Sequence, residues 1–133
     1  MSEFNGLVAL VTGGANGIGA ATSALLHQRG ARVAILDRDP EGTLPHALAV
    51  RCDVAESSAV DEAVAAVAGH FGALDVVINN AGIGATGSVS DNADDEWRRV
   101  LDVNVIGVAR VTRAALPHLR RSPRRRSRTR SSP

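Results

Sequence analysis

Short apolar runs alternate along the chain with longer segments in which apolar residues recur at helical spacing. The runs lack the polar alternation of a half-exposed strand, so they predict fully buried parallel strands. These strands are expected at Leu7–Thr12, Arg32–Leu36, Ala49–Cys52 and Leu74–Ile78. The helical stripes predict helices over Ile18–Arg29, Ser58–Phe71 and Asp94–Leu116, where Leu116-Pro117 is expected to break the last one. At the start of the second helix, Ser58-x-x-Asp61 resembles a capping box with Asp in place of Glu. The alternation of strands and helices predicts an α/β fold.

A glycine-rich turn follows the first predicted strand. After Thr12 come Gly13, Gly14, Gly17 and Gly19, a spacing that departs from the strict G-x-G-x-x-G pattern. Glycine allows backbone angles that a β-carbon forbids, and it lets a pyrophosphate approach the main chain closely. The N-terminus of the following helix would offer its free N–H groups to the same phosphates. The turn therefore predicts a dinucleotide site.

Asp37 ends the second predicted strand, about 20 residues beyond the glycines. A carboxylate at this place can accept both hydroxyls of an adenosine ribose and would repel a 2′-phosphate, which favours NAD over NADP. Arg38 weakens the argument, because a neighbouring arginine can bind a 2′-phosphate. The alternative is that Asp37 only starts the turn toward Asp39-Pro40.

A second motif, Asn79-Asn80-Ala81-Gly82, follows the fourth predicted strand. Strand-terminal asparagines can satisfy backbone groups, and Gly82 would let the chain pass close to a cofactor, although an ordinary turn could use the same residues. Together with the Thr-Gly-Gly-x-x-Gly-Ile-Gly loop at residues 12–19, this motif resembles the short-chain dehydrogenase/reductase family. The resemblance extends from Leu7 to about Leu119.

The resemblance implies a Rossmann-like doubly wound parallel sheet of strand order 3-2-1-4-5 and hydride transfer between a nicotinamide and an alcohol or carbonyl substrate. It also implies roles for particular residues. The pyrophosphate would lie on Gly13, Asn16, Gly17, Ile18 and Gly19, the adenosine ribose on Asp37, the adenine beside Asp53 and Val54, and the nicotinamide-side ribose beside Asn80, Ala81 and Gly82.

Two of the implied assignments have structural alternatives. Asp53-Val54 could simply be a strand end followed by a turn. Asn104, inside the last predicted helix, matches the family asparagine that holds a water of the proton relay beside a catalytic lysine. It could instead be a buried asparagine that satisfies backbone groups near Gly107.

The sequence contains no tyrosine and no lysine. Family enzymes continue into a fifth strand with a catalytic serine and then a helix with Tyr-x-x-x-Lys, in which the tyrosine is the general acid/base. The chain is therefore expected to be an N-terminal half, truncated after the fourth strand and the following helix, and to be inactive alone. An edge left bare on the fourth strand would favour aggregation. The alternative function is a nucleotide-binding module without turnover.

Charge divides the chain into two regions. Residues 1–119 carry an excess of acidic side chains, whereas residues 120–133 carry arginines and no acid. The first region is expected to be the partial NAD(P)-binding domain, and the second a disordered Arg/Ser/Pro-rich tail. The tail could bind nucleic acid or an acidic partner. The favoured explanation of the arginine-rich composition is that the reading frame leaves the family sequence just after Leu119. Nucleic acid is therefore not favoured as a partner.

Composition limits the remaining classes. The single cysteine, Cys52, cannot form an intrachain disulfide, which suits a reducing cytoplasm. Neither a signal peptide nor a membrane span is expected, and His46 has no neighbour at metal-ligand spacing. The family resemblance implies NAD as a partner and, in an intact homologue, an alcohol or carbonyl substrate. Oligomers are compatible with the resemblance, although the family interface would be incomplete.

Overall fold

A four-stranded parallel sheet lies at the centre of the fold. The computed structural model describes residues 3–124. The strands are β1 (Val8–Thr12), β2 (Arg32–Asp37), β3 (Leu48–Arg51) and β4 (Val76–Ile78), in the spatial order β3-β2-β1-β4. Ala9 of β1 lies opposite Val33 of β2 on one side and opposite Val76 of β4 on the other. The expected Rossmann-like α/β fold is confirmed, with β1 inside the sheet.

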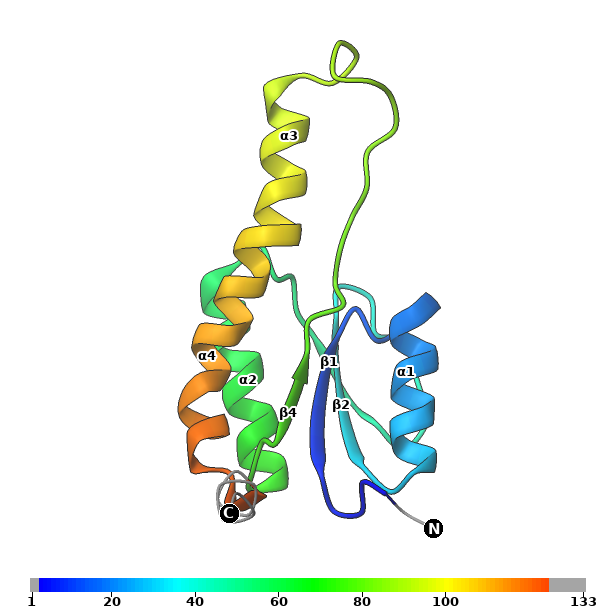
Figure 1. Ribbon diagram of the computed structural model, residues 1–133, viewed down its shortest axis with the longest axis vertical. Helices are drawn as coiled ribbons and strands as arrows, with labels where there is room; N and C mark the ends of the chain where they lie inside the picture. Colours follow the sequence, from blue (N-terminus) through cyan, green and yellow to red (C-terminus); the bar gives the residue numbers. More distant parts are fainter. Residues whose placement is uncertain (1–2, 125–133) are drawn as a thin grey trace, which may run out of the picture.

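Helices cover both faces of the sheet (Figure 1). Helix α1 (Gly17–Gln28) packs on one face, and α2 (Ser57–Phe71) and α4 (Gly107–Arg121) lie side by side on the other. Helix α3 (Asp94–Leu101) and the π-helical turn η1 (Asp102–Ile106) lead directly into α4. Together these three elements form one long helix whose first part projects beyond the sheet.

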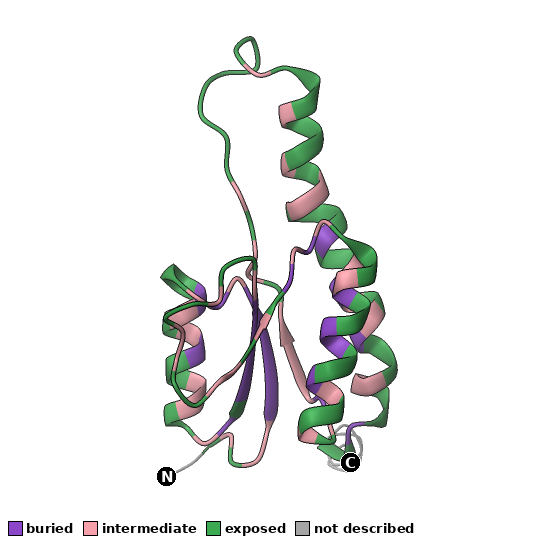
Figure 2. Ribbon diagram, turned by 180° about the vertical axis from the view of Figure 1, so that it is seen from behind, coloured by how far each residue is buried: buried purple, intermediate pink, exposed green. Residues whose placement is uncertain are grey.

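The apolar core has one layer on each side of the sheet. Val8 and Leu10 point toward α2 and α4, whereas Val11 joins Val33 and Ile35 beneath α1. Every residue of β1 is buried, as expected for a parallel strand covered on both faces, whereas α3 contains no buried residue (Figure 2). The site is thus supported by a rigid central strand.

The start of α2 differs from the capping box predicted at Ser58. The helix begins at Ser57, and its N-cap residue Glu56 makes no side-chain capping bond. A turn sets this start, because the Asp53 carboxylate accepts the Ala55 N–H and the Asp53 carbonyl accepts the Glu56 N–H. The capping-box prediction is therefore wrong, and the preceding turn begins the helix instead.

The break predicted at Leu116-Pro117 is also wrong. Helix α4 passes through Pro117 to Arg121. Proline removes one backbone donor, but Leu119 packs against the core and the buried Ser122 donates its hydroxyl to Asp75, so packing holds the last turn in place. The helix thus extends past residue 119, where the domain was expected to end. Residues 125–133 of the expected tail lie outside the described residues.

Strand β4 lies at one edge of the sheet. Within residues 3–124 it pairs with β1 alone, so no strand lies beside its second edge in the described part of the chain. No helix in the same range is long and apolar enough to cross a membrane. Aggregation through the β4 edge stays a prediction.

Candidate cofactor site

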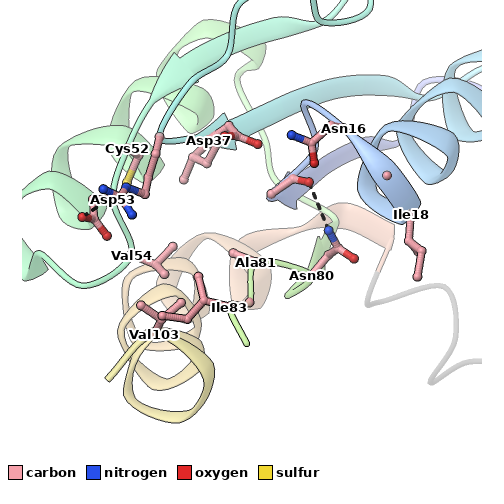
Figure 3. A pocket seen from close by; sticks show the side chains of 15 residues that line it. Asn16, Ile18, Asp37, Cys52, Asp53, Val54, Asn80, Ala81, Ile83 and Val103 are labelled. Atoms are coloured by element: carbon pink, nitrogen blue, oxygen red, sulfur yellow. Dashed lines mark hydrogen bonds and ion pairs between the residues drawn. The ribbon is translucent and has the colours of Figure 1, made fainter. Parts of the chain in front are cut away.

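A cavity of about 380 Å³ opens at the carboxyl ends of the four strands. Its wall comes from the segments that follow β1, β2, β3 and β4 and from η1 (Figure 3). The lining residues are Gly13, Asn16, Gly17, Ile18, Leu36, Asp37, Arg38, Cys52, Asp53, Val54, Asn80, Ala81, Gly82, Ile83 and Val103. The chain leaves β1 toward β2 and β3 and later returns to its other side as β4. Such a switch point is where open α/β sheets bind ligands.

The glycine loop forms one end of the cavity. Gly13 has φ of +64°, its N–H donates to the Leu36 carbonyl at 2.7 Å, and a β-carbon there would lie 2.9 Å from the Ala81 Cα. Gly17 has φ of +57° but faces open space, so its conformation alone requires glycine. Asn16 caps α1 without a side-chain hydrogen bond. The first N–H groups of α1 are therefore open to an anion.

Gly19 does not line the cavity. It lies behind the loop, where a β-carbon would overlap the carbonyl oxygen of Gly13 and approach Asn80 Nδ2 to 2.5 Å. The contribution of Gly19 in this structure is thus the close packing of α1 against the loop.

The Thr12 hydroxyl joins the segments that follow β1 and β4. It accepts the backbone N–H groups of Asn80 and Ala81, each at 3.0 Å. The Asn80 side chain donates back to the Gly13 carbonyl at 3.1 Å, which is the dashed bond in Figure 3. Thr12 is buried, so these bonds are shielded from water. In the sequence, Thr12 serves only as part of the motif, although a hydroxyl that ends an apolar strand signals such a contact.

Asp37 holds its carboxylate at the cavity through two backbone amides. Oδ2 accepts the Ala15 N–H at 3.0 Å, and Oδ1 accepts the Asp39 N–H at 3.0 Å. The second bond forms the turn toward Asp39-Pro40 that the alternative interpretation of Asp37 predicted. The first links the end of β2 to the glycine loop. Because each oxygen can accept a further hydrogen bond, the turn does not prevent contact with a ligand.

Asp53 and Val54 form the cavity wall beyond β3. Val54 is buried, and Asp53 Oδ1 accepts the Ala55 N–H at 2.9 Å. Arg38 is an exposed partner of Asp53, with 3.7 Å between Arg38 Nε and Asp53 Oδ2. Asp53 and Val54 thus form a turn at the end of β3 and also line the cavity.

Asn104 lies in η1, opposite the segment that follows β4. Its Nδ2 donates to the Ile83 carbonyl and its Oδ1 accepts the Ile83 N–H, both at 2.8 Å. As the alternative held, Asn104 satisfies backbone groups, but these belong to Ile83 rather than to the chain near Gly107, and Asn104 is exposed rather than buried. The paired bonds hold the end of the Asn79–Gly82 motif against the long helix. A role in a proton relay stays a prediction.

Comparison with known proteins decides the family. A family model described as short chain dehydrogenase matches residues 7–127. The chain belongs to the short-chain dehydrogenase family. Meso-2,3-butanediol dehydrogenase of Serratia marcescens is 37% identical, and the match covers 88% of this chain and 50% of that protein. The chain thus spans about half the length of the curated relatives it matches.

Solved structures agree with this assignment. Ligand-free aldohexose dehydrogenase from Thermoplasma acidophilum has a TM-score of 0.86 at 30% identity over 91% of this chain and 47% of that one. The 3-ketoacyl-(acyl-carrier-protein) reductase from Brucella melitensis, solved with NADH, has a TM-score of 0.83 at 37% identity over 87% of this chain and 51% of that one. Short-chain dehydrogenases bind nicotinamide cofactors.

Of the residues predicted to bind the cofactor, all except Gly19 line the cavity. Four further lining residues were not predicted from the sequence: Leu36, Cys52, Ile83 and Val103. Leu36 and Cys52 end two of the predicted strands, and Ile83 follows the Asn79–Gly82 motif. Their positions at the strand ends could therefore have indicated that they line the site. Val103 comes to the cavity only through the packing of η1. In the described part of the chain, no three His, Cys, Asp or Glu side chains are grouped to hold a metal.

We expect Cys52 to make the stability of this chain depend on pH in the alkaline range. Burial, with the charges of Asp53 and Glu56, raises the pKa of the Cys52 thiol from 9.0 to about 11. The folded state therefore holds this proton more tightly, so the stabilisation is complete below pH 9 and is lost as the pH rises through about 11. We expect the free energy of unfolding in urea to fall by about 2 kcal/mol across this window.

The absence of tyrosine and lysine makes the measurement selective, since no other side chain titrates in that range. Cys52→Ala is the control and is expected to give a flat profile between pH 9 and pH 11. An equally steep profile in this variant would show that another group is responsible.

Proposed function

We propose that this chain is the cofactor-binding part of an NAD-dependent short-chain dehydrogenase. In the intact homologue, a hydride would move between the nicotinamide and the carbon of an alcohol or carbonyl substrate. The observation that carries the proposal is the cavity at the strand ends, where the glycine loop, Asp37 and the Asn79–Gly82 motif meet. The matched relatives differ in the substrates of their names, so the proposal extends only to this substrate class.

The glycine loop would hold the pyrophosphate. Gly13, Asn16, Gly17 and Ile18 line the cavity at the N-terminus of α1, where backbone N–H groups and the helix dipole favour a negative charge. The open space at Gly17 supports this role, since a phosphate could approach the main chain there. Gly19 would act indirectly by letting the loop pack closely on α1.

Asp37 would hold the adenosine ribose and select NAD. The bond from Ala15 aims its carboxylate at the cavity, where it could accept ribose hydroxyls and repel a 2′-phosphate. The ion pair between Arg38 and Asp53 supports the same preference, because it holds Arg38 beside another carboxylate. Asp53 and Val54 would border the adenine, and Asn80, Ala81 and Gly82 the nicotinamide-side ribose.

This chain would bind the dinucleotide without catalysing hydride transfer. The bound nicotinamide would supply the hydride acceptor or donor. Among the 133 residues no tyrosine or lysine is present to move the substrate proton, and Asn104 already uses its amide to hold Ile83. We therefore expect the purified chain to bind NAD without oxidising alcohols.

Titration with both dinucleotides tests the cofactor assignment. By calorimetry, the unmodified chain should bind NAD at least about tenfold more tightly than NADP, and Asp37→Asn should abolish most of that preference. This variant removes the charge but keeps one oxygen for the Ala15 N–H. Asp39→Ala is the matched control, because Asp39 is exposed and does not line the cavity.

Each outcome decides one part of the proposal. Equal binding of the two dinucleotides, or an unchanged preference in Asp37→Asn, would contradict the choice of NAD. A folded chain that binds neither dinucleotide would overturn the proposed function itself. Circular dichroism melting of each variant shows whether the chain under test is folded.

A further inference from the structure

Arg110 of α4 connects the two sides of the cavity. Its side chain is 14% exposed, and its Nη1 donates to the Val54 carbonyl at 3.1 Å and to the Asp102 carbonyl at 3.2 Å. Its Nη2 forms an ion pair with Asp102 Oδ1 at 2.6 Å. A largely buried guanidinium that is bonded to three acceptor atoms on two different segments constrains both segments.

The first segment is the wall beyond β3. Val54 lines the cavity and packs directly against the start of α4, where a β-carbon on Gly107 would come within 2.8 Å of Val54 Cγ2. The Arg110 bond to the Val54 carbonyl lies beside this contact. The backbone of Val54 is thus tied to the same helix against which its side chain packs.

The second segment is the π-helical turn. Asp102 is the first residue of η1, and its carbonyl oxygen accepts the Gly107 N–H that closes the turn as well as the Arg110 bond. Residues 103 and 104 follow within the turn, so Val103 reaches the cavity and Asn104 holds Ile83 on the opposite wall. A π turn inside an α-helix is rare and needs local support, which Arg110 supplies.

We propose that Arg110 is a positioning residue that fixes the Val54 wall relative to the Ile83 wall and thereby sets the affinity for the dinucleotide. The link to affinity rests on the proposed function, whereas the link between the two walls does not. Arginine suits this task because its planar fork can reach three acceptors with fixed geometry. Lysine would offer a point charge without that fork.

Hydrogen exchange measured by NMR tests the link between the walls in the ligand-free chain. In Arg110→Met, the Ile83 amide, which donates to Asn104 Oδ1, should exchange about tenfold faster. The Val8 amide, which donates to Asp75 at the other end of β1, should keep its rate. A general loss of stability would accelerate both amides. Arg113→Met removes an exposed arginine from the same helix and should change neither rate.

Calorimetry with NAD tests the consequence for binding. Arg110→Met should weaken NAD about tenfold, Arg110→Lys should restore little of that loss, and Arg113→Met should bind normally. If Arg110→Met fails to fold, Asp102→Asn removes only the charged partner and should show the same selective change at Ile83.

The two measurements separate the possible failures. Unchanged exchange at Ile83, or equal acceleration at Ile83 and Val8, would overturn the positioning role. Selective exchange with unchanged NAD affinity would overturn the link to binding. An unmodified chain that binds no NAD would overturn the proposed function, while the exchange result would still decide whether Arg110 couples the walls.

Discussion

Gly19→Ala is expected to weaken NAD binding by about 100-fold, the equivalent of roughly 3 kcal/mol. The added β-carbon would overlap the Gly13 carbonyl oxygen and crowd Asn80 Nδ2, so the glycine loop would have to move away from α1. That movement would displace the backbone amides proposed to hold the pyrophosphate. Calorimetric titration of the folded variant with NAD measures the effect.

Gly69→Ala is the matched control. Gly69 lies exposed in α2, and a β-carbon there would have no heavy atom within 4 Å. Alanine should therefore leave NAD affinity unchanged and raise stability by up to about 1 kcal/mol through its higher helix propensity. A Gly19→Ala chain that binds NAD as well as this control does would contradict the argument from close packing.

Thr12→Val is expected to lower the free energy of unfolding by about 3 kcal/mol. Valine has nearly the same shape as threonine, so the change removes the acceptor for two N–H groups, those of Asn80 and Ala81, without opening a cavity. Both donors would lose their partner beside a buried strand end. Urea denaturation followed by circular dichroism measures the loss.

Thr12→Ser separates the hydroxyl from the methyl group. Serine keeps the acceptor and should lose only about 1 kcal/mol, because one buried methyl is removed. If serine and valine destabilise the chain equally, the hydroxyl is not the group that joins the segments after β1 and β4.

The strands and the glycine loop could be predicted because each depends on local chemistry. Four apolar runs produced four strands, and the glycines after Thr12 adopt a turn that begins α1. The start of α2 and the passage of α4 through Pro117 could not be predicted in this way. Local propensity favoured Ser58 as a cap and Pro117 as a break, but a neighbouring turn and the packing of Leu119 decided the outcome.

The contacts that shape the cavity are less visible in the sequence than the residues that line it. Arg110 and Val54 are 56 positions apart, and no spacing rule brings them together. The π turn that exposes Asn104 toward Ile83 also has no sequence signature, because its extra residue is accommodated by tertiary contacts. The sequence therefore indicates which residues line the site, whereas the hydrogen bonds that connect these residues are visible only in the structure.

The position of β1 between β2 and β4 also gives the two halves of the cavity different folding requirements. The half built on β1 and β2 uses segments close together in the chain, whereas β4 must return from Val76 to pair with Ala9. Closing that longer loop costs more chain entropy before the pairing can repay it. The half beside β1 and β2, which is proposed to hold the adenosine, should thus be organised early in folding, and the half beside β4, which is proposed to hold the nicotinamide side, only when β4 docks.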